Sequence, residues 1–447
     1  MRIMLGRARS QSVVAIVLAV CFSLFVASCG DDDDEGGGGG GGGAAEVKET
    51  VKASDCGPEA GTKATGEPIK LGALATKQPG TDFSEIPRMA EAYFKCVNDN
   101  GGINGRPVEY VIEYEQTDPG QAASQAKKLV ETEKVLGIVG NTSIIECDVN
   151  HKYYEAQEYY VIGSGIAPTC YSTPNFAAVN MGPRYSSDGA TQALLRQDVD
   201  KIVLDQSNVP GTAYIEEGPR LITEHAGKEF EGLKENVPIQ DANSVALKAV
   251  QAAGDNGGVV LNFTPPEALK ILQAAQQQGL QDRVKWGCST PCNTDFLAEA
   301  LGDAWDGKLF VNAELNLITA DAPDSNLYRE VQKKYAPDIP LGSFSQMGFI
   351  EARIATEALE GVDGDYTKQS VNEAFKNVKN FETDILCQPW YYGEAPLHIP
   401  NNVDRTVTPK GGTMAQEENC FEISDVDPAI KQVRDIEAED PSLVGGS

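Results

Sequence analysis

The chain has 447 residues and carries 66 Asp and Glu against 37 Lys and Arg, a formal net charge of −29. Nucleic-acid binding requires clustered basic side chains, so this balance excludes nucleic acid as a partner. Three His residues are too few for a His-rich metal site, and we expect no metal and no cofactor. The length predicts two or three folded units.

The first residues have the layout of an export signal. Three Arg precede an apolar run over residues 13–27, which is short for a membrane span, and the run ends in Val26-Ala27-Ser28-Cys29. This segment resembles the lipobox of bacterial lipoproteins. We therefore expect a signal peptide over residues 1–28 and a lipid on Cys29, with an uncleaved anchor helix or cleavage without lipid as alternatives.

Residues 29–67 contain five consecutive acids (31–35) and eight consecutive Gly (36–43) and almost no large apolar side chain. Gly-rich chain is flexible, and the acids repel one another and anionic lipid. The segment predicts a lipidated tether that holds a folded body off a membrane. Binding of a cation by the acidic run is a weaker alternative, because flexible Asp side chains have no fixed geometry.

The cysteines predict disulfides. Cys21 would leave with the signal and Cys29 would take lipid, so an even number remains in an exported chain. Eight cysteines allow 105 connectivities, of which proximity in the sequence favours one. Its pairs are Cys147 with Cys170, Cys288 with Cys292, Cys387 with Cys420 and, by remainder, Cys56 with Cys96. Zinc binding is the alternative, but the chain has no CxxC pair.

From residue 68 onward, strand-length apolar runs alternate with helical patterns. The predicted strands are 69–75, 108–115, 135–139, 201–205, 259–262 and 284–287, and the predicted helices include 86–98, 119–133 and 265–278. Asp118 and Pro119 suit the start of the second helix. Thr264 and Glu267 have the spacing of a capping box at the start of the third, and Gly279 suits its end.

Repeated strand–helix alternation predicts doubly wound α/β sheets, and its length predicts two lobes. Ligands of such sheets bind beyond the carboxyl ends of the strands. We therefore expect function in the loops that follow Val139, Ile162, Asp205, Asn262 and Gly287.

The sequence lacks the common catalytic motifs. There is no GxSxG, P-loop, HExxH or GxGxxG at a helix start. Gly163-Ser164-Gly165 is too short for a nucleophile elbow, and His151, His225 and His398 lie among polar residues, where we expect them at the surface. We therefore predict a binding protein with no catalytic residues.

Two strand-end loops are built from small residues, Gly140-Asn141-Thr142-Ser143 and Gly163-Ser164-Gly165-Ile166-Ala167. Small side chains let a ligand approach the backbone, and free amides near Ser143 can accept an anionic group. Ordinary turns use the same residue types, so composition alone leaves both interpretations open.

Residues 98–108 (NDNGGINGRPV), the acidic strand ending at Glu115, and Asp118-Pro119 before an Ala-rich helix resemble the N-lobe of branched-chain amino acid binding proteins of ABC transporters. The resemblance implies a type I periplasmic-binding fold, in which two α/β lobes are joined by three crossover strands and close on a ligand. It implies one lobe over 68–183 plus 312–384, another over 184–311 plus 385–425, and an acidic tail over 426–447.

The resemblance also implies ligand contacts. In the first lobe, hydroxyls and amides that hold an α-carboxylate in the family would come from Asn141, Thr142, Ser143, Ser164, Gly165 and Ile166. In the second lobe we expect Asn208, Thr264, Ser289 and Thr290 at the ligand. Phe344 and Gln346 are weaker candidates for the same cleft.

The second lobe departs from the family pattern, which has a Tyr after the strand matching 201–205 and an ammonium-binding acid after the strand matching 284–287. Here these loops read QSNVPG and CSTPC. An unpaired buried ammonium would cost several kcal/mol. An amide or an organic acid therefore stands beside an amino acid as the expected ligand.

The expected function is that of a monomeric solute-binding lipoprotein, anchored through Cys29 at the outer face of the cell membrane, which passes a small polar ligand to an ABC permease and its ATPase. The alternatives are a ligand sensor for a membrane signalling partner and, last, an exported hydrolase.

Overall fold

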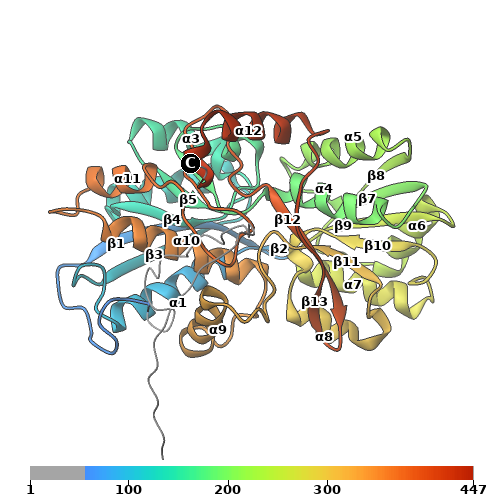
Figure 1. Ribbon diagram of the computed structural model, residues 1–447, viewed down its shortest axis with the longest axis horizontal. Coiled ribbons are helices and arrows are strands. Elements are labelled where there is room, and N and C mark those ends of the chain that lie inside the picture. The colour runs from blue at the N-terminus through green and yellow to red at the C-terminus, as the bar shows by residue number, and fades with distance from the viewer. Residues whose placement is uncertain (1–55, 446–447) are drawn as a thin grey trace, which may run out of the picture. The chain divides into compact units, whose positions relative to one another are not determined.

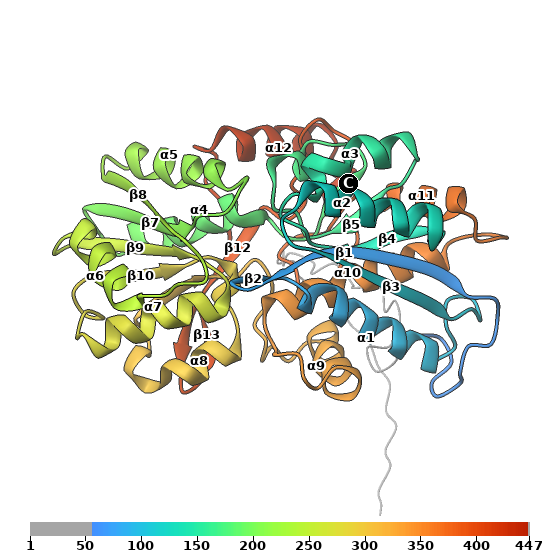
Figure 2. The same cartoon turned by 180° about the vertical axis from the view of Figure 1, so that it is seen from behind.

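The computed structural model describes residues 56–445, which form two sheets with helices on both faces (Figures 1 and 2). The predicted signal peptide, Cys29 and the acidic and glycine runs lie outside the described residues. Within 56–445, no helix is both long and apolar enough to cross a membrane.

The first sheet has parallel strands in the order β3-β1-β4-β5-β6, with the short β2 antiparallel to the end of β1. Its strands are β1 (Ile69–Gln78), β2 (Thr81–Asp82), β3 (Val108–Glu115), β4 (Gly137–Asn141), β5 (Val161–Gly163) and β6 (Phe176–Ala178). The nonsequential order is that of a doubly wound sheet, as the alternation predicted.

The second sheet has the order β13-β12-β11-β10-β9-β7-β8, parallel from β11 to β8 and antiparallel from β11 to β13. Its strands are β7 (Lys201–Ser207), β8 (Glu229–Glu235), β9 (Gly257–Asn262), β10 (Lys285–Cys288), β11 (Leu309–Asn312), β12 (Val403–Lys410) and β13 (Thr413–Glu422). All six predicted strands coincide with observed ones, with ends that differ by up to three residues.

The helices pack on the faces of these sheets and form the core of each lobe together with the strands. Those of the first lobe are α1 (Glu85–Asp99), α2 (Pro119–Lys127), α3 (Glu146–Ala156), α9 (Pro323–Tyr335), α10 (Ser343–Glu360) and α11 (Lys368–Lys376). Those of the second are α4 (Gly182–Leu195), α5 (Glu217–His225), α6 (Ala242–Ala253), α7 (Pro265–Gln277) and α8 (Asp295–Leu301). The last helix of the chain is α12 (Pro428–Glu439).

The chain passes from one lobe to the other before α4, after β11 and before β12, which are the three expected crossovers. Helix α4 packs closely on the second and third of them. A Cβ at Gly189 would lie 1.9 Å from Asn312 Oδ1 and 2.2 Å from Asp404 Oδ2, so any larger residue would displace these two buried side chains.

The boundaries of the lobes differ from expectation in the last third of the chain. Residues 385–402, which we assigned to the second lobe, lie in the first, because Ile385, Trp390 and Tyr392 belong to its hydrophobic core. The segment expected as an acidic tail contains α12, whose Ile430 and Val433 are buried in the same lobe. The chain thus crosses between the lobes a fourth time, after β13, and ends in the first lobe (Figure 1).

The folded body begins before residue 68. Cys56 is bonded to Cys96 in α1, and the backbone amides of Glu59 and Ala64 donate to the carbonyls of Asn100 and Asn98. The last residues of the expected flexible tether are therefore fixed on the first lobe.

The predicted helix starts had different outcomes. Asp118 accepts a hydrogen bond from the Gln121 amide at 2.7 Å, which confirms it as a cap. The prediction of a capping box at the start of α7 was wrong, since the Thr264 side chain makes no cap hydrogen bond. The Glu267 carboxylate instead accepts from the Ile239 amide, and the α7 amides do not bind it.

All four expected disulfide pairs are present: Cys56–Cys96, Cys147–Cys170, Cys288–Cys292 and Cys387–Cys420. Three join segments 23 to 40 residues apart, whereas Cys288–Cys292 closes a five-residue ring directly after β10.

Candidate functional site

A cavity of about 90 Å³ lies between the carboxyl ends of the two sheets. Strand-end loops of both lobes line it, as doubly wound sheets predict. Six of the ten expected ligand contacts are in its lining: Thr142, Ser164, Ile166, Thr264, Ser289 and Thr290. Asn141, Ser143, Gly165 and Asn208 are not.

In the loop after β4, one side chain faces the cavity and two hydrogen-bond within the lobe and hold the loop in place. The Thr142 hydroxyl is buried, lines the cavity and has no hydrogen-bond partner. Asn141 accepts from the Leu74 amide at 2.7 Å and donates to Glu146 at close range. Ser143 donates to Glu115 at 2.8 Å. Asn141 and Ser143 therefore have structural contacts.

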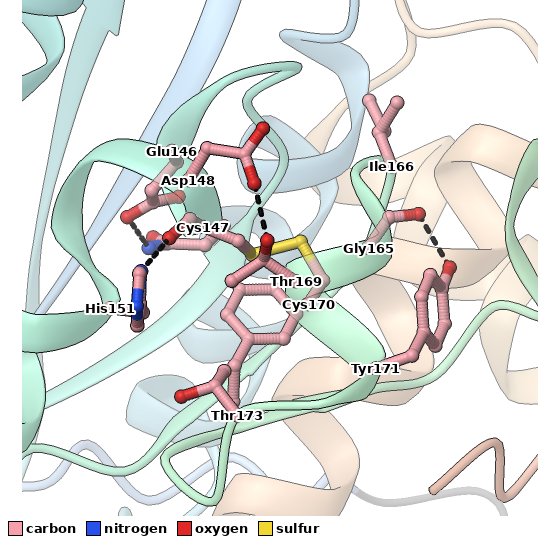
Figure 3. Close-up of a disulfide and its surroundings, with 12 residues drawn as sticks. Glu146, Cys147, Asp148, His151, Gly165, Ile166, Thr169, Cys170, Tyr171 and Thr173 are labelled. Carbon is pink, nitrogen blue, oxygen red and sulfur yellow. Dashed lines mark hydrogen bonds between the residues drawn. A yellow bond between two sulfur atoms is a disulfide. The ribbon is translucent and has the colours of Figure 1, made fainter. Parts of the chain in front are cut away.

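The loop after β5 is also fixed from behind. The Ser164 hydroxyl donates to the buried Glu351 carboxylate at 2.5 Å. The Gly165 carbonyl accepts from the Tyr171 hydroxyl at 2.6 Å, as Figure 3 shows. Tyr171 follows Cys170, and the Cys147–Cys170 bond ties this segment to α3. The Ile166 side chain is left to line the cavity.

On the second lobe, the Cys288–Cys292 ring presents Ser289, Thr290 and Pro291 to the cavity. The Ser289 hydroxyl is fully buried and has no partner. The Thr290 hydroxyl accepts from Asn312 Nδ2 at 2.7 Å and keeps its own proton for donation. This is the loop after β10, where the resemblance implies an acid and the sequence has none.

The two lobes contact each other beside the cavity. Thr264 of the second lobe donates to the Gly80 carbonyl of the first at 3.3 Å, and the Tyr214 hydroxyl donates to the Ile166 carbonyl. Asn208 is exposed and does not line the cavity, although Ser207 and Val209 do, and its side chain donates to Asn236 at 3.0 Å. Thr264 is thus placed between the lobes, and Asn208 on the second lobe alone.

Sequence reasoning missed most of the apolar lining. Phe83 and Phe344 meet edge to face, with ring centroids 5.4 Å apart, and Phe263 comes from the opposite lobe. Phe344 was a weak candidate that lines the cavity, whereas Gln346 donates to the Asn316 carbonyl and does not. Phe263 was within reach of prediction, because it directly follows the strand ending at Asn262.

Glu314 was missed as well, and it is the one ionisable side chain among the described residues that line the cavity. It lies just past the crossover after β11 and is 1% exposed. Its Oε2 accepts from the Met181 amide at 2.6 Å. Burial raises the pKa of Glu314 to about 8, against the opposing effects of that amide and of the Thr290 hydroxyl.

No histidine is among the described residues that line the cavity. His398 is 1% exposed and bonded through its ring to the carbonyls of Phe176 and Ala395, so its expected surface position was wrong. Burial lowers its pKa. His151 bonds to the Cys147 carbonyl in α3 (Figure 3). Over residues 56–445 no group of three or more His, Cys, Asp or Glu is placed to hold a metal ion.

Known proteins share this architecture. The chain is 23% identical over 350 residues to a Leu/Ile/Val-binding protein homologue of Brucella abortus, covering 74% of this chain and 86% of that one. A fatty acid ABC transporter substrate-binding protein from Thermomonospora curvata superposes with a TM-score of 0.68 at 20% identity, covering 88% of this chain and 99% of that one. A branched-chain amino acid ABC transporter protein from Thermus thermophilus with bound valine gives 0.69 at 16% identity, covering 82% and 98%.

These structures confirm the type I periplasmic-binding fold that the N-lobe motif implied. A family model described as periplasmic binding protein matches residues 68–403. The chain therefore belongs to the periplasmic binding protein family.

Proposed function

We propose that this protein is an extracytoplasmic solute-binding lipoprotein that captures a small ligand between its lobes and delivers it to an ABC permease. One observation carries the proposal. The Thr142 and Ser289 hydroxyls, from opposite lobes, line the same cavity and are buried without partners. Burying an unpaired hydroxyl is unfavourable, and a polar ligand that bonds to both would remove that cost.

Catalysis is not part of the proposal. The one serine with a catalytic-looking context, Ser164, donates to Glu351, and no histidine is among the described residues that line the cavity. The family consists of binding proteins.

A thermal-shift screen of amino acids, amines, amides and organic acids tests the binding step, because a ligand that binds only the folded state raises its melting temperature. Replacing both Thr142 and Ser289 with Ala should abolish the shift, whereas Asn208→Ala should leave it unchanged. Absence of a shift with every compound would refute the proposal.

Lipid attachment is tested separately. The segment before Cys29 supports cleavage and acylation there, and the glycine run supports a tether. Cys29→Ser should move the protein from the membrane fraction to the soluble exported fraction and abolish labelling by a radioactive fatty acid. Labelling that persists in this variant would place the anchor elsewhere.

A further inference from the structure

The charge of the cavity restricts the class of ligand. Glu314 is the one ionisable group in its described lining, and no Lys, Arg or His accompanies it. A buried anionic ligand without a basic partner loses its hydration and gains no ion pair. The lining therefore offers a carboxylate no ion pair and suits a neutral or positively charged group.

Four backbone amides of the two first-lobe loops already have partners inside that lobe. The Thr142 amide donates to the Leu74 carbonyl at 2.9 Å, and the Ser164 amide to the Asn141 carbonyl at 2.8 Å. The Gly165 amide donates to Asn180 Oδ1 at 2.7 Å. Close to Ser143, the Ile144 amide donates to the Thr76 hydroxyl at 3.0 Å. These four amides are thus unavailable to an anionic ligand, which weakens the anion site expected in these loops.

Glu314 is held firmly enough to act as a binding group. Its carboxylate accepts from the Met181 amide in the first crossover, and its carbonyl accepts from Asn401 Nδ2 near the third at 3.2 Å. The side chain is therefore fixed where the three crossovers meet, and the apolar rings of Phe83 and Phe344 line the same cavity.

We propose that the ligand is a primary amine with an apolar body and no carboxylate, bound through its ammonium to Glu314 and through its hydrocarbon to the aromatic lining. This inference rests on the proposed function and narrows its ligand class. The Thr142 and Ser289 hydroxyls then accept the remaining ammonium protons or solvate a further polar group.

The pH dependence of affinity has a definite sign. Below pH 8, where burial keeps the Glu314 carboxyl protonated, an ammonium displaces that proton on binding. Amine affinity should therefore rise from pH 6 to pH 8 by up to about tenfold per unit. A carboxylate ligand needs the protonated form, so its affinity should be nearly flat from pH 6 to pH 7 and should fall above pH 8.

Two other titratable groups face Glu314, and they require a control. Asp404 in β12 and Tyr171 both interact electrostatically with Glu314, and burial raises the pKa of each. Arg405, next to Asp404, opposes the shift of that carboxyl. Glu314→Gln removes the proton in question and keeps an acceptor for the Met181 amide. The pH slope should vanish in this variant if Glu314 causes it.

The test is isothermal titration calorimetry on the full chain purified in detergent. The probes are 3-methylbutylamine and 2-phenylethylamine, the amides and carboxylates of the same skeletons, and leucine and phenylalanine. We expect at least one amine to bind a hundredfold more tightly than its carboxylate. Glu314→Gln should weaken the amine at least tenfold and change amide binding less than threefold.

Tighter binding of a carboxylate, an amide or an amino acid would overturn the amine inference and leave the proposed function intact. Unchanged amine affinity in Glu314→Gln would overturn the role of Glu314. No binding of any probe, together with no shift in the wider screen, would overturn both the inference and the proposed function.

Discussion

The two loops that face each other across the cavity are built in opposite ways. The first-lobe loop, residues 140–145, is held by buried side chains, Asn141, Ser143 and Glu115, which hydrogen-bond inside the lobe. The second-lobe loop, residues 288–292, is held by a covalent bond between its ends. Each leaves one hydroxyl unpaired, Thr142 or Ser289. The two loops thus present a similar hydroxyl to the cavity, but hydrogen bonds hold the first loop in place and a disulfide holds the second.

The polar network should be the more sensitive of the two. Asn141→Ala leaves the buried Leu74 amide without a partner and removes one of the two hydrogen bonds of Glu146, and we expect a loss of about 2–4 kcal/mol in the free energy of unfolding. Thr142→Ala, the adjacent control, should cost less than about 0.5 kcal/mol while weakening ligand binding. Urea unfolding of the empty protein measures the free energy of unfolding of both variants. A stable Asn141→Ala variant with impaired binding would make Asn141 a ligand contact.

Removing the cross-link should have a smaller effect on stability and a local one on binding. A closed ring of five residues restricts the unfolded chain by about 2 kcal/mol, and Cys288→Ser with Cys292→Ser gives up that restriction. Ligand affinity should fall as well, because Ser289 and Thr290 are presented by the ring. Unfolding without reductant and titration calorimetry test the two effects. Unchanged affinity would show that the loop keeps its shape without the bond.

The fold was predictable because it depends on patterns that are local in the sequence. The strand runs, Asp118 before Pro119 and the spacing of the cysteines each predicted what the structure shows. The assignment of residues 385–402 to the second lobe was wrong. Trp390 and Tyr392 could fill either hydrophobic core, and the local sequence pattern does not show which one. Glu314 was missed for a related reason. It lies beside the cavity only because the crossovers meet there, and that meeting depends on residues far apart in the sequence. Thr264 matched a cap but bonds across the lobes.

Each lobe has a buried carboxyl group that should make the stability of the protein depend on pH. Burial raises the pKa of Glu146 in the first lobe and of Asp205 in the second to about 8 each. Both are protonated when folded and ionise near pH 4 when unfolded, so their contribution to stability is complete below about pH 4 and declines up to pH 8. Empty protein should therefore melt at a lower temperature at pH 9 than at pH 6.

Asp205 is the sharper site for that test, because both of its oxygens are buried without hydrogen bonds, whereas Glu146 bonds to Asn141 and Tyr154. Asp205→Asn cannot ionise and should reduce the fall in melting temperature between pH 6 and pH 9. Asp303→Asn, at an exposed acid, should not. Identical pH profiles for Asp205→Asn and the unmodified chain would mean that the Asp205 carboxyl is hydrated in solution.

The smallest effect is expected where the two lobes touch. Thr264 makes one neutral hydrogen bond of 3.3 Å to the Gly80 carbonyl, and such a bond contributes about 0.5–1.5 kcal/mol. Because the bond exists only when the lobes are together, its loss in Thr264→Ala should weaken ligand binding by up to about tenfold and leave the unfolding of each lobe unchanged. Thr264→Ser keeps the hydroxyl and should bind as the unmodified chain does. Equal weakening in the two variants would assign the effect to the lost methyl group, and the hydrogen bond would then have no part in holding the lobes closed.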